Sequence, residues 1–326
     1  QGEPVPDGVR DMVTNDRAGW FLAHSVLERS DLALAAELLP TEFDGPWTEA
    51  ATLSSRAMIE HAAGDMDALD RVATRSDQLF AELGDRWGRL RASDWLGGLA
   101  EMRGESERAA AVHREGLRWA EELELGPEVG AKLSWLAWLA VQNRENTRGR
   151  ELAERAYRLA VEQGAPTSVI FAEMSLGMAA RREGRLDLAV THLTRIADQG
   201  RVEAQPPPYL TMILVELGYA TELLGDPAGA LALHREAYAA TTGSDRGAIG
   251  PLEGMAAVVD PEAGARLLGA AATLRDHTAT PTAPAEQADL DRTTRRLVAA
   301  LGSGRFDDLV AEGAKLSPDQ AALFGR

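Results

Sequence analysis

The 326-residue sequence contains no cysteine and few aromatic residues, which make up 5% of it. The absence of cysteine excludes a disulfide framework, a thiolate zinc site and a cysteine nucleophile. It is typical of a reducing compartment, and we expect a cytoplasmic protein. Long hydrophobic runs are missing too, since none approaches the roughly 18 residues that a membrane-spanning helix needs. We therefore expect no membrane partner.

Basic charge is also scarce. The 51 acidic residues outnumber the 34 basic ones and give a net charge of −17, and Lys132 and Lys315 are the only lysines. A surface of this charge repels the phosphate backbone of DNA or RNA, so direct contact with nucleic acid is not expected. The sequence begins at Gln1 rather than at a methionine, and we expect it to be a piece of a longer protein.

Motifs of enzymes and of metal sites are missing as well. There is no G-x-S-x-G elbow, no H-E-x-x-H pair and no G-x-G-x-x-G loop after a strand. The stretch from Gly126 to Lys132 comes closest to a phosphate-binding loop, but Ala131 separates Gly130 from the lysine and breaks the required spacing. We predict that the chain is not an enzyme and has no catalytic residue, no cofactor and no metal site.

The sequence does contain an internal repeat. A small residue recurs at steps of 40, 40, 40 and 41 residues, a turn follows each copy seven positions later, and a third residue follows the turn by five. The small residues are Ala57, Gly97, Ala137, Gly177 and Gly218, the turn residues are Gly64, Gly104, Arg144, Gly184 and Gly225, and the third set is Leu69, Ala109, Gly149, Ala189 and Ala230.

Each copy has the pattern of a helical hairpin. A first helix ends at the turn, where glycine tolerates the left-handed conformation, and a second helix packs closely against the first through small residues. Weaker copies flank the five. Ala23, with a turn at Ser30 and Asp31, precedes them, and residues 252–274, with a shortened first helix and a turn at Asp260, follow them. We predict about seven hairpins within residues 1–277.

The order of these positions resembles the tetratricopeptide repeat, in which a bulky residue such as Tyr157 or Tyr238 follows the alanine. That family has a usual period of 34, whereas HEAT and armadillo repeats have periods nearer 40 and are the structural competitor. The placement of the turn and of the alanine favours the tetratricopeptide alternative. We predict an all-α, tetratricopeptide-like α-solenoid, a right-handed superhelix of helical hairpins with C-terminal capping helices.

Proline and glycine mark the links between the hairpins and the start of a tail. The expected links are residues 126–127, 164–166, 205–208 and 241–251, and a proline-bearing loop at 278–284 opens a tail that comprises residues 278–326. The tail should contain a helix over residues 285–301 that caps the last hairpin, with Arg295 and Arg296 in solvent. One face of this helix carries Leu290, Thr294, Leu297, Val298 and Leu301.

Residues 251–321 carry a more specific resemblance. The stretches ARLLGAA at 265–271, PAE-x-AD at 284–289 and F-x-x-x-x-AEGAKLS at 306–317 resemble the closing segment of actinobacterial ATP-binding LuxR-type (LAL) regulators and of Streptomyces antibiotic regulatory proteins (SARP). The resemblance implies a cytoplasmic sensory module, attached in the parent protein to a nucleotide-binding switch domain and a helix-turn-helix DNA-binding domain. The link at residues 258–260 is shorter than in these families.

Defined positions of each first helix point into the concave surface of a tetratricopeptide array. The candidate ligand- or partner-binding residues at these positions are Trp20, His24, Met58, His61, Asp94, Trp138, Phe171, Met174, Met178, Arg181 and Tyr219. Methionine and aromatic side chains suit a partner with apolar parts, and charged side chains can fix its polar ends. The helix period does not separate a lined groove from a packed core, so both alternatives stay open.

Two arginines have two interpretations each, and two histidines have a single, structural one. Arg181 and Arg182 can clamp an anionic group, or they can offset the helix dipole before Gly184. His113 and His234 occupy equivalent sites of second helices, where a bulky packing residue belongs. We predict that both histidines are structural.

Together these features predict an effector- or partner-sensing module of a bacterial transcriptional regulator. A small molecule, a peptide or a protein segment would occupy the concave groove and favour one curvature of the array. The alternative is a constitutive protein–protein interaction or oligomerisation scaffold without a small-molecule effector. Exchange of Trp138 and Met178 for alanine should separate the two hypotheses.

Overall fold

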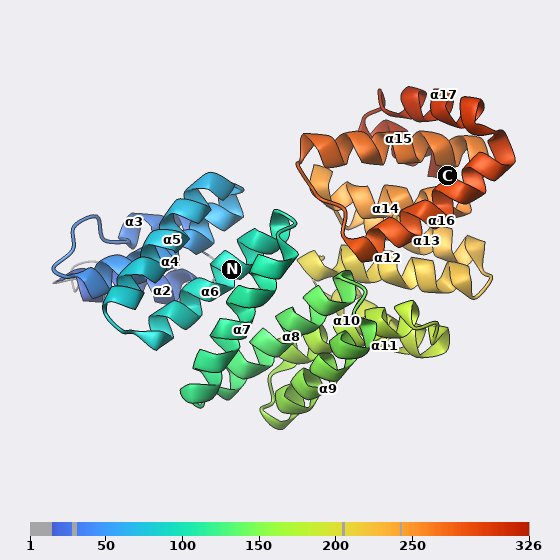
Figure 1. The fold of residues 1–326 in the computed structure, drawn as a ribbon. Coiled ribbons are helices and arrows are strands. Elements are labelled where there is room, and N and C mark those ends of the chain that lie inside the picture. The colour runs from blue at the N-terminus through green and yellow to red at the C-terminus, as the bar shows by residue number, and fades with distance from the viewer. Residues whose placement is uncertain (1–14, 28–30, 204–205, 242, 326) are drawn as a thin grey trace. The chain divides into compact units, whose positions relative to one another are not determined.

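A computed structural model describes residues 15–27, 31–203, 206–241 and 243–325 (Figure 1). All regular structure in these ranges is helical, and they contain no strand. The prediction of an all-α, tetratricopeptide-like fold is confirmed. None of the helices in this part of the chain is long and apolar enough to cross a membrane.

Within the described ranges, fourteen consecutive helices pair into seven hairpins. The pairs are α2 (Asp16–Leu27) with α3 (Leu32–Leu38), α4 (Pro46–Ala63) with α5 (Met66–Glu82), α6 (Arg86–Met102) with α7 (Ser106–Glu122), α8 (Gly126–Gln142) with α9 (Asn146–Glu162), α10 (Pro166–Arg182) with α11 (Leu186–Arg201), α12 (Pro208–Leu223) with α13 (Pro227–Ala239), and α14 (Asp245–Val258) with α15 (Pro261–His277). Ser30 and Gln205, placed by the sequence in a turn and a link, lie outside the described residues.

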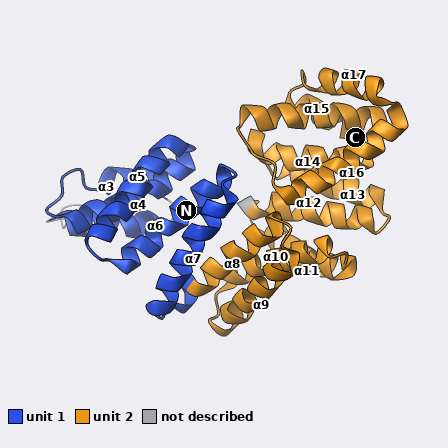
Figure 2. Cartoon of the chain, in the orientation of Figure 1, with its two compact units in different colours: residues 1–128 blue, residues 129–326 orange. Residues whose placement is uncertain are grey.

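The chain divides into two compact units, residues 1–128 and 129–326 (Figure 2). Unit 1 contains α2 to α7, and unit 2 contains most of α8 and all later helices. The division falls inside the predicted array, and the boundary that the sequence suggests between residues 277 and 278 stays a prediction.

All five predicted turn residues adopt the left-handed conformation. Their φ angles are 76° at Gly64, 74° at Gly104, 65° at Arg144, 75° at Gly184 and 90° at Gly225. Glycine reaches this region without steric cost, whereas Arg144 adopts it despite the steric cost of its Cβ atom. The turns thus explain why each first helix stops where the repeat predicts.

Glycines at the repeat positions bring the two helices of a hairpin together. A Cβ atom at Gly97 would lie 2.4 Å from Nε2 of His113, and one at Gly218 would lie 2.4 Å from Cε1 of His234. Both histidines are fully buried, which confirms the structural role predicted for them. In each hairpin the imidazole ring therefore occupies the space that a side chain at the glycine would need.

The predicted link at residues 241–251 is wrong, because α14 begins at Asp245 and continues through Pro251. Ser244 caps the helix, and its hydroxyl accepts a hydrogen bond from the Gly247 amide at 3.1 Å. A proline inside a helix costs a hydrogen bond and usually ends it. Here Pro251 and Leu252 are buried in the last hairpin, and this packing maintains the helix.

The tail forms α16 (Pro284–Leu301), α17 (Ser303–Gly313), α18 (Pro318–Ala322) and a short 3-10 helix, η1 (Leu323–Gly325). Helix α17 crosses α15 at two glycines. A Cβ at Gly269 would lie 2.1 Å from the Val310 carbonyl oxygen, and one at Gly313 would lie 2.0 Å from that of Arg266. Two of the stretches that carry the family resemblance, ARLLGAA and AEGAKLS, therefore pack on each other.

Helix α16 has the predicted extent, but its buried face differs from the predicted one. The buried residues of α16 are Ala285, Asp289, Thr293 and Leu297, whereas Leu290, Thr294, Val298 and Leu301 are only partly buried. Arg296 is also not in solvent, since it donates a hydrogen bond to the Ala256 carbonyl oxygen at 2.8 Å. The apolar period missed this face because its central residue is a carboxylate with buried partners.

Candidate functional site

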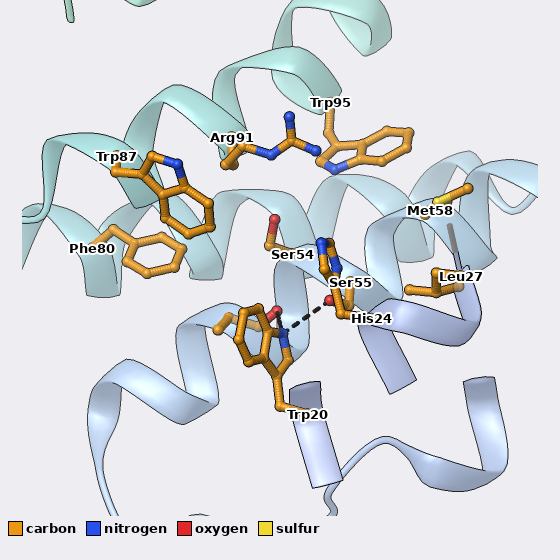
Figure 3. A pocket seen from close by; sticks show the side chains of 11 residues that line it. Trp20, His24, Leu27, Ser54, Ser55, Met58, Phe80, Trp87, Arg91 and Trp95 are labelled. Atoms are coloured by element: carbon orange, nitrogen blue, oxygen red, sulfur yellow. Dashed lines mark hydrogen bonds between the residues drawn. The ribbon is translucent and has the colours of Figure 1, made fainter. Parts of the chain in front are cut away.

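Unit 1 contains a hollow between α2, α4, α5 and α6, which belong to its three hairpins (Figure 3). The space among its lining residues is about 430 Å³ and includes open solvent, so the hollow is an open depression and not an enclosed cavity. The hollow is lined by Trp20, His24, Leu27, Ala51, Ser54, Ser55, Met58, Phe80, Trp87, Arg91 and Trp95.

The floor of the hollow is held by hydrogen bonds and ring contacts. The indole N–H of Trp20 donates to the Ala51 carbonyl oxygen at 3.0 Å and lies 3.1 Å from the Ser55 hydroxyl oxygen. The Trp20 ring stacks on the His24 ring with centroids 5.3 Å apart, and the edge of Trp47 meets it at 5.2 Å. Trp20 therefore has a fixed orientation and presents ring surface.

The rim of the hollow is formed by α6. Trp87, Arg91 and Trp95 follow one another at intervals of four residues, which places them on one face of this helix. Figure 3 shows the Arg91 guanidinium between the two indole rings, across the opening from Ser54 and His24. The two tryptophans were not among the predicted site residues, although their helical spacing in the sequence was a usable signal.

The structure brings together three predicted site residues, Trp20, His24 and Met58, in this hollow. His61 is exposed beside it, with its ring centroid 5.7 Å from that of Trp95. Asp94 lies next to Arg91, with 3.8 Å between the carboxylate and the guanidinium. Three of the predicted site residues thus line the hollow, and His61 and Asp94 each contact one of its α6 residues.

The other predicted site residues lie in unit 2, and most of them are interior. Met174, Met178, Arg181 and Tyr219 are 1–5% exposed, and the two methionines pack with the aliphatic core between α10 and α12. The partly buried Trp138 packs on the same core, whereas Phe171 remains 41% exposed. For the four interior residues, the structure selects the packed alternative that the helix period left open.

Arg181 and Arg182 bind two carboxylates of the chain itself. The Arg181 side chain donates to Glu216 at 2.6 Å and to both carboxylate oxygens of Asp289 at 3.1 and 3.0 Å. Arg182 donates to Asp289 at 2.6 Å, to Glu216 at 3.2 Å and to the Ala285 carbonyl oxygen at 2.8 Å. The pair therefore clamps anionic groups, which was one of the two interpretations. These groups are carboxylates of the chain's own helices α12 and α16.

Burial and charge shift the pKa values of the groups in this cluster. Burial alone would raise the pKa of Asp289, but the charges and hydrogen bonds of Arg181 and Arg182 hold it below its ordinary value. Burial, and then the nearby charges of Glu253 and Asp289, raise the pKa of Tyr219 well above 10.0. Asp289 is thus ionised and Tyr219 neutral near pH 7.

Further contacts join α16 to the first helices of three hairpins, which are α10, α12 and α14 (Figure 1). Arg292 donates to Glu222 on α12 at 2.8 Å, and Arg296 reaches the backbone of α14. We call the surface that α16 covers the inner face of unit 2; it is formed by Arg181 and Arg182 on α10, Glu216, Tyr219 and Glu222 on α12, and Ala256 on α14. Two of these, Arg181 and Tyr219, are concave positions named from the sequence, and the segment that lies on them is the tail of the same chain.

No family model matches the sequence, and no curated protein sequence matches it. Among solved structures, the chain is similar to NprR in complex with its cognate peptide NprX, with 13% identity, a TM-score of 0.62, and coverage of 96% of this chain and 91% of that one. It is also similar to a Rap protein complexed with Competence and Sporulation Factor, with 14% identity, a TM-score of 0.56, and coverage of 97% and 96%.

A third similar structure is a Signal Transduction ATPase with Numerous Domains (STAND) protein with a tetratricopeptide repeat sensor from Pyrococcus horikoshii. It has 13% identity and a TM-score of 0.53, and the match covers 91% of this chain but only 44% of that protein. The chain thus spans less than half the length of this STAND protein. At such identities the likeness concerns the fold, and the narrower resemblance to LAL and SARP regulators stays a prediction. The chain is a tetratricopeptide-like helical solenoid.

Proposed function

We propose that this chain is the sensing module of a bacterial transcriptional regulator and that its effector, a small molecule or a peptide, binds in the hollow of unit 1. The observation that supports this choice is the difference between the two units. The candidate residues of unit 1 surround an open hollow, whereas the inner face of unit 2 is covered by α16. Trp20, His24 and Met58 would contact the effector, with His61 and Asp94 at its edge.

The chemistry of the hollow and the similar structures support a regulatory role. Aromatic and methionine side chains provide apolar surface that adapts to ligand shape. The similar NprR structure contains its cognate peptide NprX, and the Rap protein is complexed with Competence and Sporulation Factor. The similar STAND protein has a tetratricopeptide repeat sensor. We extend this role to the present chain. A cytoplasmic location and attached nucleotide-binding and DNA-binding domains belong to the same proposal, through the resemblance of residues 251–321.

The proposed mechanism is a shift between arrangements of the hairpins in unit 1. Trp20 belongs to the first hairpin, Met58 to the second and Arg91 to the third. A ligand in contact with all three stabilises the arrangement in which they converge and, through its differential affinity, disfavours the others. In the parent protein, such a shift would change the contacts of the array with the switch domain.

The test is selection of a displayed random peptide library on the chain and on a variant with Met58→Glu. Peptides should be retained by the original protein and lost by the variant, because a carboxylate is introduced into the apolar hollow. Val161→Glu, at an exposed position of α9, is the matched control and should retain them. Melting followed by circular dichroism checks that both variants fold. Equal retention by the Met58→Glu variant would exclude the hollow as the site.

The scaffold alternative is tested by a separate measurement, that of the mass of the protein in solution. A constitutive assembly module would show a mass above that of one chain in light scattering without any ligand. Exposed apolar side chains in unit 2, such as Val161 on α9 and Leu223 on α12, lie on different helices. Scattered residues of this kind are normal on soluble proteins and do not favour the scaffold. Trp138→Ala with Met178→Ala no longer separates the hypotheses, because Met178 is part of the core.

A further inference from the structure

The hollow of unit 1 lacks acidic side chains, although the chain carries 51 of them. Its eleven lining residues include one arginine, Arg91, and no aspartate or glutamate. The Arg91 side chain is 43% exposed and forms an ion pair with the Asp94 carboxylate, which lies 3.8 Å away and is not a lining residue of the hollow. Because a guanidinium has five N–H donors in a planar fork, Arg91 keeps donors for an anionic group in the hollow.

Three indole rings surround the same opening. The N–H group of Trp20 is already bonded to Ala51, so this residue offers only ring surface. Trp87 and Trp95 flank Arg91 on α6, and Trp87 is exposed (Figure 3). Indole rings stack on other flat rings with centroids about 4.5–7 Å apart. The walls therefore favour a planar aromatic group over a flexible aliphatic one.

We infer that the hollow binds a planar aromatic group that carries a single carboxylate, an inference that rests on the proposed function. The ring lies among the indole side chains and Met58, and the carboxylate pairs with the guanidinium of Arg91. The Ser54 hydroxyl faces the same opening and donates a second hydrogen bond to the carboxylate (Figure 3).

The single arginine selects a carboxylate rather than a phosphate. A phosphate group carries a charge of about −1.5 to −2 at pH 7 and is recognised by clusters of arginines. One guanidinium matches the single charge and the planar shape of a carboxylate, with which it forms two parallel hydrogen bonds. The same chemistry occurs in a free aromatic acid and in an aromatic residue at the C-terminus of a peptide.

The experiment is titration calorimetry of the whole chain with indole-3-acetate and with its neutral analogue indole-3-acetamide. The acid should bind at least about tenfold more tightly, because a charge-assisted hydrogen bond is lost in the amide. Arg91→Gln should remove this preference. Arg86→Gln is the matched control: Arg86 lies on the same helix, its side chain is exposed, and it pairs with Glu122 at 3.1 Å, so the preference should remain.

A second pair of probes distinguishes the two sources of the ligand. The tripeptide Gly-Gly-Trp is compared in its free-acid and amidated forms. Tighter binding of the tripeptide acid than of indole-3-acetate supports a peptide C-terminus, and the reverse order supports a free aromatic acid. Cyclohexylacetate tests the aromatic part, since it keeps the carboxylate but has no flat ring, and it should bind more weakly than indole-3-acetate.

Several results would overturn this inference. They are equal binding of acid and amide, an unchanged preference in the Arg91→Gln variant, equal binding of cyclohexylacetate, and the absence of heat with every probe at millimolar concentration. If these occur while library peptides are still lost on Met58→Glu, the ligand class is wrong and the proposed function stands. If the Met58→Glu variant retains the library peptides, the proposed function itself fails.

Discussion

Arg144 occupies a turn position that is glycine in the four other main repeats, and it has a φ angle of 65°. For a residue with a Cβ atom, the left-handed conformation costs about 1–2 kcal/mol. The chain bears this cost because the turn must join α8 to α9 at a fixed length. The position is therefore a local weakness of unit 2.

We predict that Arg144→Gly raises the free energy of unfolding of unit 2 by about 0.5–1 kcal/mol. Relief of the strained φ angle exceeds the extra entropy that glycine gives to the unfolded chain. Urea titration followed by circular dichroism measures the change. Gly184→Ala, at the equivalent turn of the next hairpin, should lower the same quantity. A lower stability of Arg144→Gly would contradict the strain argument.

His234 is a buried neutral base. Burial, together with the positive charge of Arg181, lowers its pKa from 6.5 to about 3. Its ring lies between two glycines, since a Cβ at Gly218 or Gly254 would come within 2.4 Å of it, and neither ring nitrogen has a hydrogen-bond partner among the described residues. The histidine thus acts as a packing residue that titrates only when the chain unfolds.

Native stability should therefore fall as the pH is lowered from 6.5 toward 3. In this window the unfolded chain binds a proton at His234 that the native chain does not bind, which costs about 2 kcal/mol at pH 5. His234→Leu should remove this contribution, so the stability difference between the two proteins narrows on acidification. Urea titrations at pH 7 and pH 5 measure it. His277→Gln, at an exposed position, is the control and should leave the pH dependence unchanged.

Helix α16 shows how an element can be fixed by charge as well as by apolar packing. Its inward residues Ala285, Asp289 and Arg292 meet the inner face of unit 2 through hydrogen bonds and ion pairs. Leu290 and Leu297 on the same helix pack on the cluster formed by α14 and α15. A buried ion pair is costly to break, because removal of one partner leaves the other charge without compensation.

We predict that Asp289→Asn destabilises unit 2 by about 3–5 kcal/mol, since Arg181 and Arg182 stay buried beside a neutral amide. The control is Asp291→Asn, at an exposed position of the same helix, which should change stability by less than about 0.5 kcal/mol. Chemical unfolding followed by circular dichroism gives both values. Equal stabilities of the two variants would mean that α16 is not held by this cluster.

The crossing of α15 and α17 gives a second prediction at this scale. Gly313→Ala should displace α17, because the new methyl group meets a backbone oxygen rather than a movable side chain. Hydrogen exchange of the α17 amides should become faster. Gly304→Ala lies in the same helix with nothing within 4 Å of the new atom. It should slow exchange instead, since alanine favours the helix by up to about 1 kcal/mol over glycine.

At the scale of the whole molecule, the two compact units should unfold as separable steps, because each has its own buried core. Five of the seven tryptophans lie in unit 1 and report mainly on it. In the Asp289→Asn variant, circular dichroism should show an earlier unfolding step while the main fluorescence transition keeps its midpoint. A common shift of both signals would show that the units unfold together.

The sequence alone determined the helical hairpins. A small residue, a turn residue and a third residue at fixed spacing are local requirements, since a left-handed turn needs glycine at most copies and close helices need small side chains. The extent of α16 also followed from its apolar period and its proline. The start of α14 at Asp245 did not follow from the sequence. By local rules Pro251 is a helix breaker, and only its burial in the last hairpin keeps it inside the helix.

Only the tertiary structure decided which of the candidate surfaces remains open. His24 and Tyr219 occupy equivalent inner positions of their repeats, each directly after the small residue, yet His24 lines a hollow and Tyr219 lies beneath α16. The contact between Arg181 and Asp289 joins residues 108 positions apart, and no helical period encodes such a distance. Periodicity specifies the direction of a side chain from its own helix, whereas accessibility depends on what the rest of the chain places against it.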